Sequence, residues 1–138
     1  MNKVDNNDRT PLNNASQAGQ IESVKYLISQ GGDVNQSDNC GWSPLHVAAF
    51  KGHVSVIDIL ISHGADMNTK VTSSDWSEGM TPLIMAIHES KVSAAEALIK
   101  HGADVNIGNK EGKRPLTLAK EKGMNRIVEL IKEHGGHK

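Results

Sequence analysis

The strongest constraint in this sequence is an internal repeat. The chain contains only four prolines, at positions 11, 44, 82 and 115, and their spacings are 33, 38 and 33 residues. Glycines keep the same spacing at positions 31, 64, 102 and 135, and leucines keep it at positions 12, 45, 83 and 116. A repeat of this length with one insertion predicts a stack of similar units rather than a single large core.

Each unit begins with residues that favour a helix start. Thr10, Ser43 and Thr81 precede three of the prolines, and a hydroxyl there can accept a hydrogen bond from a free amide of the first turn. The proline takes the first helical position, where its missing N–H has no cost. Arg114 precedes the fourth proline, so we expect the fourth unit to start its helix less firmly.

Glycine is expected to end the first helix of most units. A helix of about eight residues should stop at Gly19, Gly52 and Gly123, because glycine readily adopts the left-handed conformation that ends a helix. Ser90 stands at this position in the third unit, so a slightly altered turn is expected there. Apolar residues at helical spacing then predict a second helix in each unit.

Two motifs resemble those of a known family. Residues 43–49 read SPLHVAA, which is similar to the T-P-L-H-x-A motif of the ankyrin repeat. Residues 64–68 and 102–106 read GADMN and GADVN and resemble a turn of the same family. The resemblance covers residues 5–136 and implies an all-α solenoid of four stacked helix-turn-helix units with projecting β-hairpin loops. It also implies that His46 makes local hydrogen bonds.

The whole chain, residues 1–138, is expected to form one ankyrin repeat domain. The repeats are placed near 5–37, 38–70, 76–108 and 109–136, with the insertion near 70–76. Polar residues in the first and last units occupy positions that resemble capping positions: Asn13, Asn14, Ser16 and Lys120. Terminal repeats need polar outer faces, so we expect a complete, capped four-repeat domain, with a fragment of a longer array as the alternative.

Composition argues against several other classes of protein. The net charge of -1 is unfavourable for nucleic-acid binding, which needs a basic face. Cys40 is the only cysteine, so no intrachain disulfide can form, which fits a reducing compartment. The first residues do not resemble a signal peptide, and no apolar run is long enough to span a membrane. We therefore expect a cytoplasmic protein, with a nuclear or host-delivered location left open.

The histidines do not indicate a metal or catalytic site. His63, His101 and His134 recur once per repeat near the end of the second helix, where an imidazole suits the helix dipole. Packed helices lie roughly 8–10 Å apart, too far for one metal ion to join them. The sequence has no nucleophile elbow, P-loop or dinucleotide fingerprint. We expect no cofactor, no metal and no enzymatic activity.

The resemblance implies where a partner protein would bind. In ankyrin repeats the residue two before each proline and the residue six after it usually face the concave surface. Loop tips contribute as well. The candidate partner-binding residues at these places, together with the adjacent Lys51, are Arg9, Gln17, Asn39, Trp42, Phe50, Lys51, Trp76, Glu78, Met80, His88 and Lys113.

Trp42 and Phe50 are two of the four aromatic residues, and neither falls on a core position of the repeat. With Met80 and Trp76 they are predicted to form an exposed apolar patch, because Trp and Met are enriched at interfaces. The alternative is that Trp42 and Phe50 merely stack on each other. The insertion either contacts a partner or is a passive loop. Tyr26, at an interior position of its helix, is expected to be core.

The function predicted from these features is a non-enzymatic, monomeric protein-interaction module that binds a partner protein on its concave face and loop tips. An alternative is an inhibitor or pathogen effector that blocks an enzyme or receptor. A designed scaffold, an enzyme and a small-ligand or sugar site around Trp42 are weaker alternatives. The uneven third unit and the insertion argue against a designed scaffold, because designed repeats are usually uniform.

Overall fold

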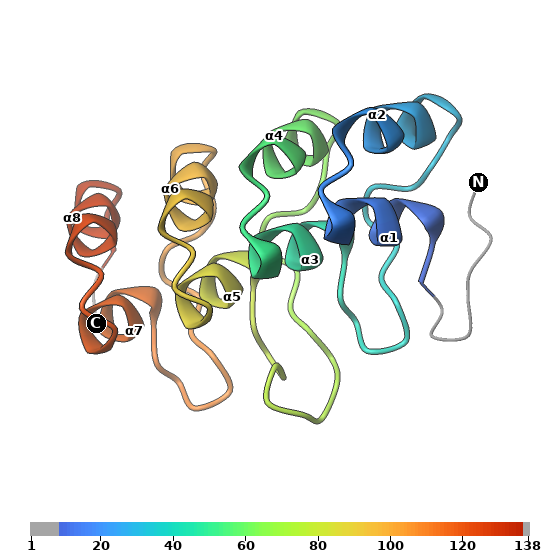
Figure 1. Ribbon diagram of the computed structural model, residues 1–138. Helices are drawn as coiled ribbons and strands as arrows, with labels where there is room; N and C mark the ends of the chain where they lie inside the picture. The colour runs from blue at the N-terminus through green and yellow to red at the C-terminus, as the bar shows by residue number, and fades with distance from the viewer. Residues whose placement is uncertain (1–8, 137–138) are drawn as a thin grey trace.

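A computed structural model describes residues 9–136, and within this range the chain forms eight helices and no strand. They are four pairs, namely α1 (Pro11–Ala18) and α2 (Ile21–Ser29), α3 (Pro44–Lys51) and α4 (Val54–Ser62), α5 (Pro82–His88) and α6 (Val92–Lys100), and α7 (Pro115–Glu121) and α8 (Asn125–Glu133). The first helices of the pairs form one row and the second helices form another (Figure 1). The predicted all-α solenoid of stacked helix pairs is confirmed.

The helix starts follow the local sequence. The hydroxyl of Thr10 accepts a hydrogen bond from the Asn13 amide at 3.1 Å, and that of Thr81 accepts one from the Ile84 amide at 3.2 Å. Ser43 forms a capping box with His46, whose ring nitrogen accepts a bond from the Ser43 amide. Arg114 makes no side-chain cap for α7. The first helices of the first three repeats, α1, α3 and α5, are therefore capped as predicted, and α7 in the fourth repeat has no side-chain cap.

The expected change at Ser90 is absent. Ser90 has a φ of 57°, close to the 76° of Gly52 and the 69° of Gly123. The amide of Lys91 donates to the carbonyl of Ala86 at 2.8 Å, as His53 does to Ala48 at 2.9 Å in the second repeat. The turn therefore keeps the shape that glycine gives elsewhere, because the following helix must pack in the same place, and Ser90 adopts the left-handed conformation at a steric cost.

Replacing Ser90 by glycine should stabilise the protein. Left-handed backbone costs a non-glycine residue about 1–2 kcal/mol, and the added freedom of glycine in the unfolded chain offsets about 0.5–1 kcal/mol of that. We expect Ser90→Gly to raise the free energy of unfolding by about 0.5 kcal/mol in urea titrations. Ser93→Gly, inside α6, is the matched control and should lower it. A decrease for Ser90→Gly would contradict the strain at this turn.

The core is aliphatic and lies between the two rows of helices. The leucines of the repeated motif are almost fully buried, with exposed fractions of 1%, 0%, 0% and 4% at Leu12, Leu45, Leu83 and Leu116. In the third repeat the large side chain of Ile84 on α5 and the small side chain of Ala95 on α6 are both buried. Large side chains on α5 thus face small ones on α6, which keeps the interior filled.

The prediction that Asn13 and Ser16 form a polar outer face of the first repeat is wrong. Asn13 and Ser16 are 1% and 0% exposed, so they do not form a polar outer face, although Asn14 is exposed. The side-chain amide of Asn13 donates to the carbonyl of Trp42 at 3.2 Å. The position therefore points at the next repeat, where a polar side chain can satisfy a backbone carbonyl.

Tyr26 is 60% exposed and is not a core residue. Ala97 occupies the same repeat position in α6 and shares a groove with Val54 and Asp58 of α4, so this position faces the preceding repeat. In the part of the chain that the structure describes, no helix precedes α1 to cover Tyr26. The neighbour, rather than the repeat position, decides whether this residue is buried.

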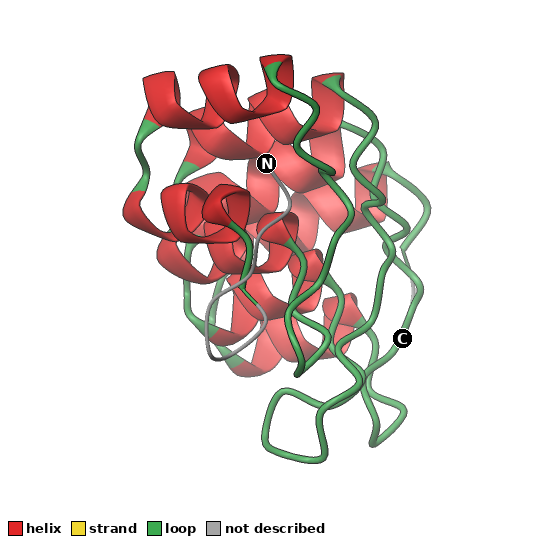
Figure 2. Ribbon diagram, turned by 90° about the vertical axis from the view of Figure 1, so that its right-hand side faces the viewer, coloured by secondary structure: helices red, strands yellow, loops and turns green. Residues whose placement is uncertain are grey.

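The loops between repeats have hairpin-like turns without strands in the described range, which corrects the expected β-hairpins. The amide of Asp38 donates to the carbonyl of Trp42 at 3.0 Å, and that of Asn109 donates to Lys113 at 2.8 Å. The loop with the insertion is closed by a bond from the Val71 amide to the Met80 carbonyl. The loops lie along one side of the helices and project beyond them (Figure 2).

Asparagines link neighbouring repeats at the turns. Asn35 donates to the carbonyl of Gly64 at 3.2 Å and accepts from the amide of Asp66 at 2.7 Å. Asn68 accepts from the amide of Asp104 at 3.0 Å. Each bond joins one repeat to the next, so these asparagines have a structural role.

Candidate functional site

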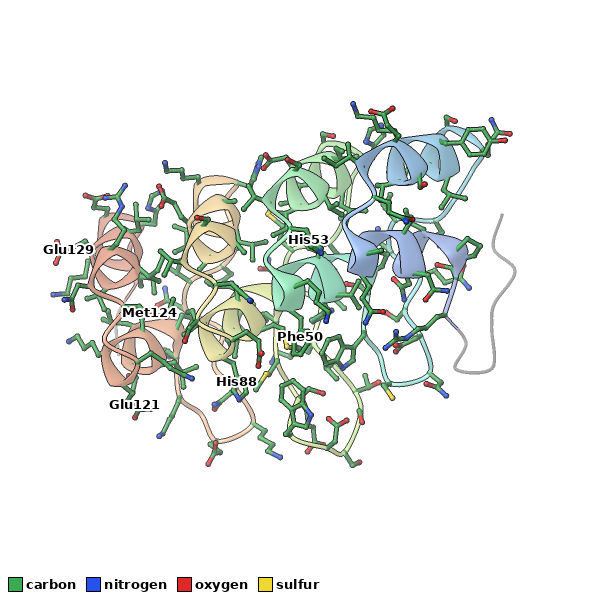
Figure 3. The ribbon with its side chains drawn as sticks, viewed as in Figure 1. Phe50, His53, His88, Glu121, Met124 and Glu129 are labelled. Atoms are coloured by element: carbon green, nitrogen blue, oxygen red, sulfur yellow. The ribbon has the colours of Figure 1, made fainter. Side chains whose placement is uncertain are left out.

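The first helices and the loops form one continuous face. Phe50, His88 and Glu121 project from the C-terminal ends of α3, α5 and α7 toward the side of the loops (Figure 3). The positions six residues after the prolines therefore share this face, which we call the loop-side face. The repeat architecture places these side chains, because each first helix begins at its proline and has nearly the same length.

Four rings from the second and third repeats meet on the loop-side face. Trp42 packs edge-to-face against Phe50, with ring centroids 5.3 Å apart, and against Trp76 at 5.9 Å. Trp76 in turn stacks on the imidazole of His88 at 5.1 Å. We call Trp42, Phe50, Trp76 and His88 the aromatic cluster. Trp42, Phe50 and Trp76 thus meet as expected, and Trp42 and Phe50 also pack on each other.

The members of the aromatic cluster differ in burial. Trp42 and Phe50 are partly buried and pack against the hydrophobic core. Trp76 is 47% exposed and His88 is exposed. The rings of Trp42 and Phe50 thus form a support, and Trp76 and His88 present their surfaces to the outside.

The insertion is folded back onto this support. The indole N–H of Trp42 donates to the hydroxyl of Ser77 at 3.2 Å, and Ser77 is fully buried. The carboxylate of Asp75 accepts bonds from both the amide and the hydroxyl of Ser77. Val71 is 2% exposed and anchors the base of the loop. These contacts hold Trp76 in place, so the insertion is an ordered part of the loop-side face.

Met80 does not belong to the exposed patch, contrary to the prediction. It is 6% exposed and its carbonyl accepts a hydrogen bond from Nε2 of His46 at 2.9 Å. Its side chain belongs to the hydrophobic core, whereas Trp42 at the equivalent position is only partly buried. The position two before the proline is therefore a surface position in one repeat and a core position in the next.

Arg9 and Gln17 contact each other at the N-terminal end of the loop-side face. The Arg9 guanidinium donates to the Gln17 side chain at 2.6 Å and lies 3.5 Å from the carboxylate of Asp38. Asp38 was missed by the sequence analysis. Its side chain is 4% exposed and accepts bonds from the amides of Cys40 and Trp42. In the last loop, Asn109 accepts bonds from the amides of Glu111 and Lys113 in the same way. An Asp or Asn six residues before the proline is therefore the sequence feature that could have identified Asp38.

The remaining candidates line the C-terminal part of the face and its rim. Lys113 pairs with Glu121 at 3.0 Å, which raises the pKa of the lysine. Glu78 lies 4.0 Å from Lys110. Lys51 lies 5.6 Å from the centre of the Phe50 ring, and Asn39 is exposed at a loop tip. These polar groups surround the aromatic cluster without joining it.

A cavity of about 230 Å3 opens beside the aromatic cluster, between the first two loops. Its lining includes Trp42, Phe50 and Val47 together with Arg9, Asp38 and Asp75. A larger hollow of about 570 Å3 beside Tyr26 lies at the N-terminal end of the stack, away from the loop-side face. The cavity beside the aromatic cluster is the one that lies among the candidate residues.

The histidines at the ends of the second helices, His63, His101 and His134, have structural partners. His63 and His134 donate through Nδ1 to the carbonyls of Ile59 and Leu130, each at 2.9 Å, at the ends of α4 and α8. His101 reaches across to Asp58 at 2.8 Å. Within residues 9–136, no three side chains of the metal-binding types are arranged to hold an ion.

None of the helices within residues 9–136 is both long and apolar enough to cross a bilayer.

Comparison with known proteins agrees with the architecture. No curated protein matches the chain. A family model described as ankyrin repeats in three copies matches residues 1–71 and 68–138, which together span the whole sequence. Ankyrin repeats are generally protein-interaction modules. With its stacked helix pairs and this match, the chain belongs to the ankyrin repeat family.

Proposed function

We propose that this protein is a non-enzymatic interaction module that binds a partner protein on its loop-side face, centred on the aromatic cluster. The observation that carries the proposal is the position of Trp76, a half-exposed tryptophan held on a rigid support by an ordered insertion. A large side chain that is already fixed loses little entropy when a partner covers it. Tryptophans in such positions are common hot spots of interfaces.

The surroundings of the cluster suit an interface of this kind. Apolar rings lie at the centre and polar groups such as Glu78, Lys110 and Lys113 lie around them. A polar rim around an apolar centre is the usual anatomy of protein interfaces. The net charge of -1 favours a protein over a nucleic acid as the partner. We further propose that the protein acts as a monomer in the cytoplasm, where Cys40 would stay reduced.

Affinity capture with immobilised protein tests the proposal. We expect Trp76→Ala to weaken capture of the partner at least tenfold, because truncation of a hot-spot tryptophan commonly has effects of this size. Trp76 is preferred to Trp42 and Phe50 for this test because those two rings also pack on the core. The measurement is the amount of partner retained from an extract of the source organism, followed by titration of the purified partner.

Tyr26→Ala is the matched control, because Tyr26 is an exposed aromatic residue at the end of the stack. It should leave capture unchanged. If Trp76→Ala kept full affinity for every captured protein while Tyr26→Ala lost it, the loop-side face would not be the binding surface. Thermal unfolding of each variant confirms that the fold is intact.

A further inference from the structure

The cavity beside the aromatic cluster is lined by both apolar and charged side chains. Trp42, Phe50 and the buried Val47 supply the apolar lining. Arg9 and Asp38 lie on one wall, and Asp75 from the insertion also borders the space. An entering side chain would therefore meet both apolar surface and the exposed carboxylate of Asp75.

The charges around the cavity leave one carboxylate without a cationic partner. Arg9 lies 3.5 Å from Asp38, so these two charges compensate each other. Among residues 9–136, no lysine, arginine or histidine forms an ion pair with the Asp75 carboxylate. Lys110 donates instead to the backbone carbonyl of Asp75 at 3.4 Å and lies 4.0 Å from the carboxylate of Glu78. The hydrogen bonds from the Ser77 hydroxyl and amide lower the pKa of Asp75, which keeps its carboxylate ionised at neutral pH. Arg9, Asp38 and Asp75 are the charged residues of the lining, so the lining of the cavity carries a net negative charge.

Aromatic rings next to a free carboxylate recognise cations that have an apolar stem. Ring faces attract ammonium and guanidinium groups, and Lys51 already lies 5.6 Å from the centre of the Phe50 ring. Lys51 does not line the cavity, so the space remains open to another cation. Between the two basic side chains, arginine has the better match, because its flat guanidinium stacks on rings and can bind a carboxylate through two N–H groups.

We propose that this cavity binds an arginine side chain from a peptide segment of the partner protein, with the stem against Trp42 and Phe50 and the guanidinium at Asp75. The inference rests on the proposed function, since it specifies what the partner presents to the loop-side face. An acidic partner is disfavoured because Arg9 is already engaged by Asp38 and Gln17. A nucleic acid is disfavoured because Asp75 would repel its phosphates.

The probes are short neutral peptides that differ at one residue, which is arginine, lysine, citrulline or glutamate. Citrulline has nearly the shape of arginine without its charge. Trp42 and Trp76 are the only tryptophans, so the two indole N–H signals in a proton–nitrogen NMR spectrum report directly on the site. We expect the arginine peptide to shift the Trp42 signal at millimolar concentration or below, and the citrulline peptide to bind about tenfold more weakly.

Asp75→Asn should lower the affinity for the arginine peptide about tenfold and leave the affinity for the citrulline peptide unchanged. The loop should keep its shape in this variant, since asparagine can still accept the Ser77 bonds. Asp104→Asn is the matched control. Asp104 is an exposed carboxylate that accepts a bond from the amide two residues later, as Asp75 does, but it lies in a distant turn. It should not change the affinity for either peptide.

Three results would overturn the inference. These are the absence of any indole shift with the arginine peptide, equal binding of arginine and citrulline peptides, and equal loss for Asp75→Asn and Asp104→Asn. Tighter binding of the glutamate peptide would assign the cavity to an acidic partner, and equal binding of the lysine peptide would remove the preference for arginine. The capture experiment with Trp76→Ala is independent of these titrations. A loss of capture in that variant with no arginine binding would keep the proposed function and reject only this inference.

Discussion

Acidification from pH 7 to pH 4 is expected to remove about 3 kcal/mol of folding stability through His46 alone. This side chain is fully buried, and burial lowers its pKa from 6.5 to about 4. The unfolded chain therefore binds a proton between these two values while the folded protein does not. The stabilisation is fully present above pH 6.5 and is lost as the pH falls from 6.5 to 4, at about 1.4 kcal/mol per pH unit.

The physical reason lies in the hydrogen bonds of the ring. Nδ1 accepts from the Ser43 amide at 3.2 Å, so Nε2 carries the proton and donates to the Met80 carbonyl at 2.9 Å. A second proton on Nδ1 would remove that acceptor and place an unpaired charge in the core. Urea denaturation followed by circular dichroism at several pH values measures the effect.

His46→Asn is the control for this prediction. Asn13 occupies the same position in the first repeat, where its amide donates to the carbonyl of Trp42, the equivalent of Met80. Asparagine can thus keep the bond between repeats without titrating. The difference in stability between wild type and His46→Asn should shrink by about 3 kcal/mol between pH 7 and pH 4. A constant difference across this range would show that His46 is not the titrating group.

Truncation of Trp42 is expected to lower the free energy of unfolding by about 3 kcal/mol. This side chain packs on the core, contacts the rings of Phe50 and Trp76, and donates to the buried Ser77 hydroxyl. Trp42→Ala would therefore leave a cavity, an unpaired hydroxyl and an unsupported insertion. These contacts argue against the fully exposed position that the sequence predicted for Trp42.

Three further variants test whether the loss of stability comes from the contacts of Trp42. Tyr26→Ala removes another aromatic residue from an exposed place and should change stability by less than about 0.5 kcal/mol. The effects of Trp42→Ala and Trp76→Ala should not add in the double variant, because the two rings contact each other. Additive effects would mean that the insertion is not supported by Trp42.

The parts of the structure that were predicted correctly depend on neighbours in the sequence. Thr10 and Thr81 cap helices because the amides they accept from lie three residues away. His46 closes a capping box with Ser43 for the same reason. Four copies of one motif strengthened each of these predictions, since a pattern repeated at the same spacing is rarely accidental.

The errors concern positions whose surroundings come from other repeats. Met80 and Trp42 occupy the same repeat position, but Met80 is part of the hydrophobic core and Trp42 is only partly buried. Tyr26 was expected in the core because its position is covered in later repeats, and it lacks a preceding helix in the described range. Asn13 looked like a surface residue and is buried against the second repeat. Residue type and spacing do not contain this information.

The sequence by itself determined the repeat, the helix pairs, the turns and the family, because each of these follows from contacts within about ten residues that recur along the chain. Only the tertiary structure decided which equivalent positions are exposed, how the insertion folds onto Trp42, and which charges remain around the cavity. Asp75 illustrates the difference. It is an ordinary loop residue in the sequence, and it borders an aromatic cavity because Ser77 beside it is anchored by a tryptophan of the preceding repeat.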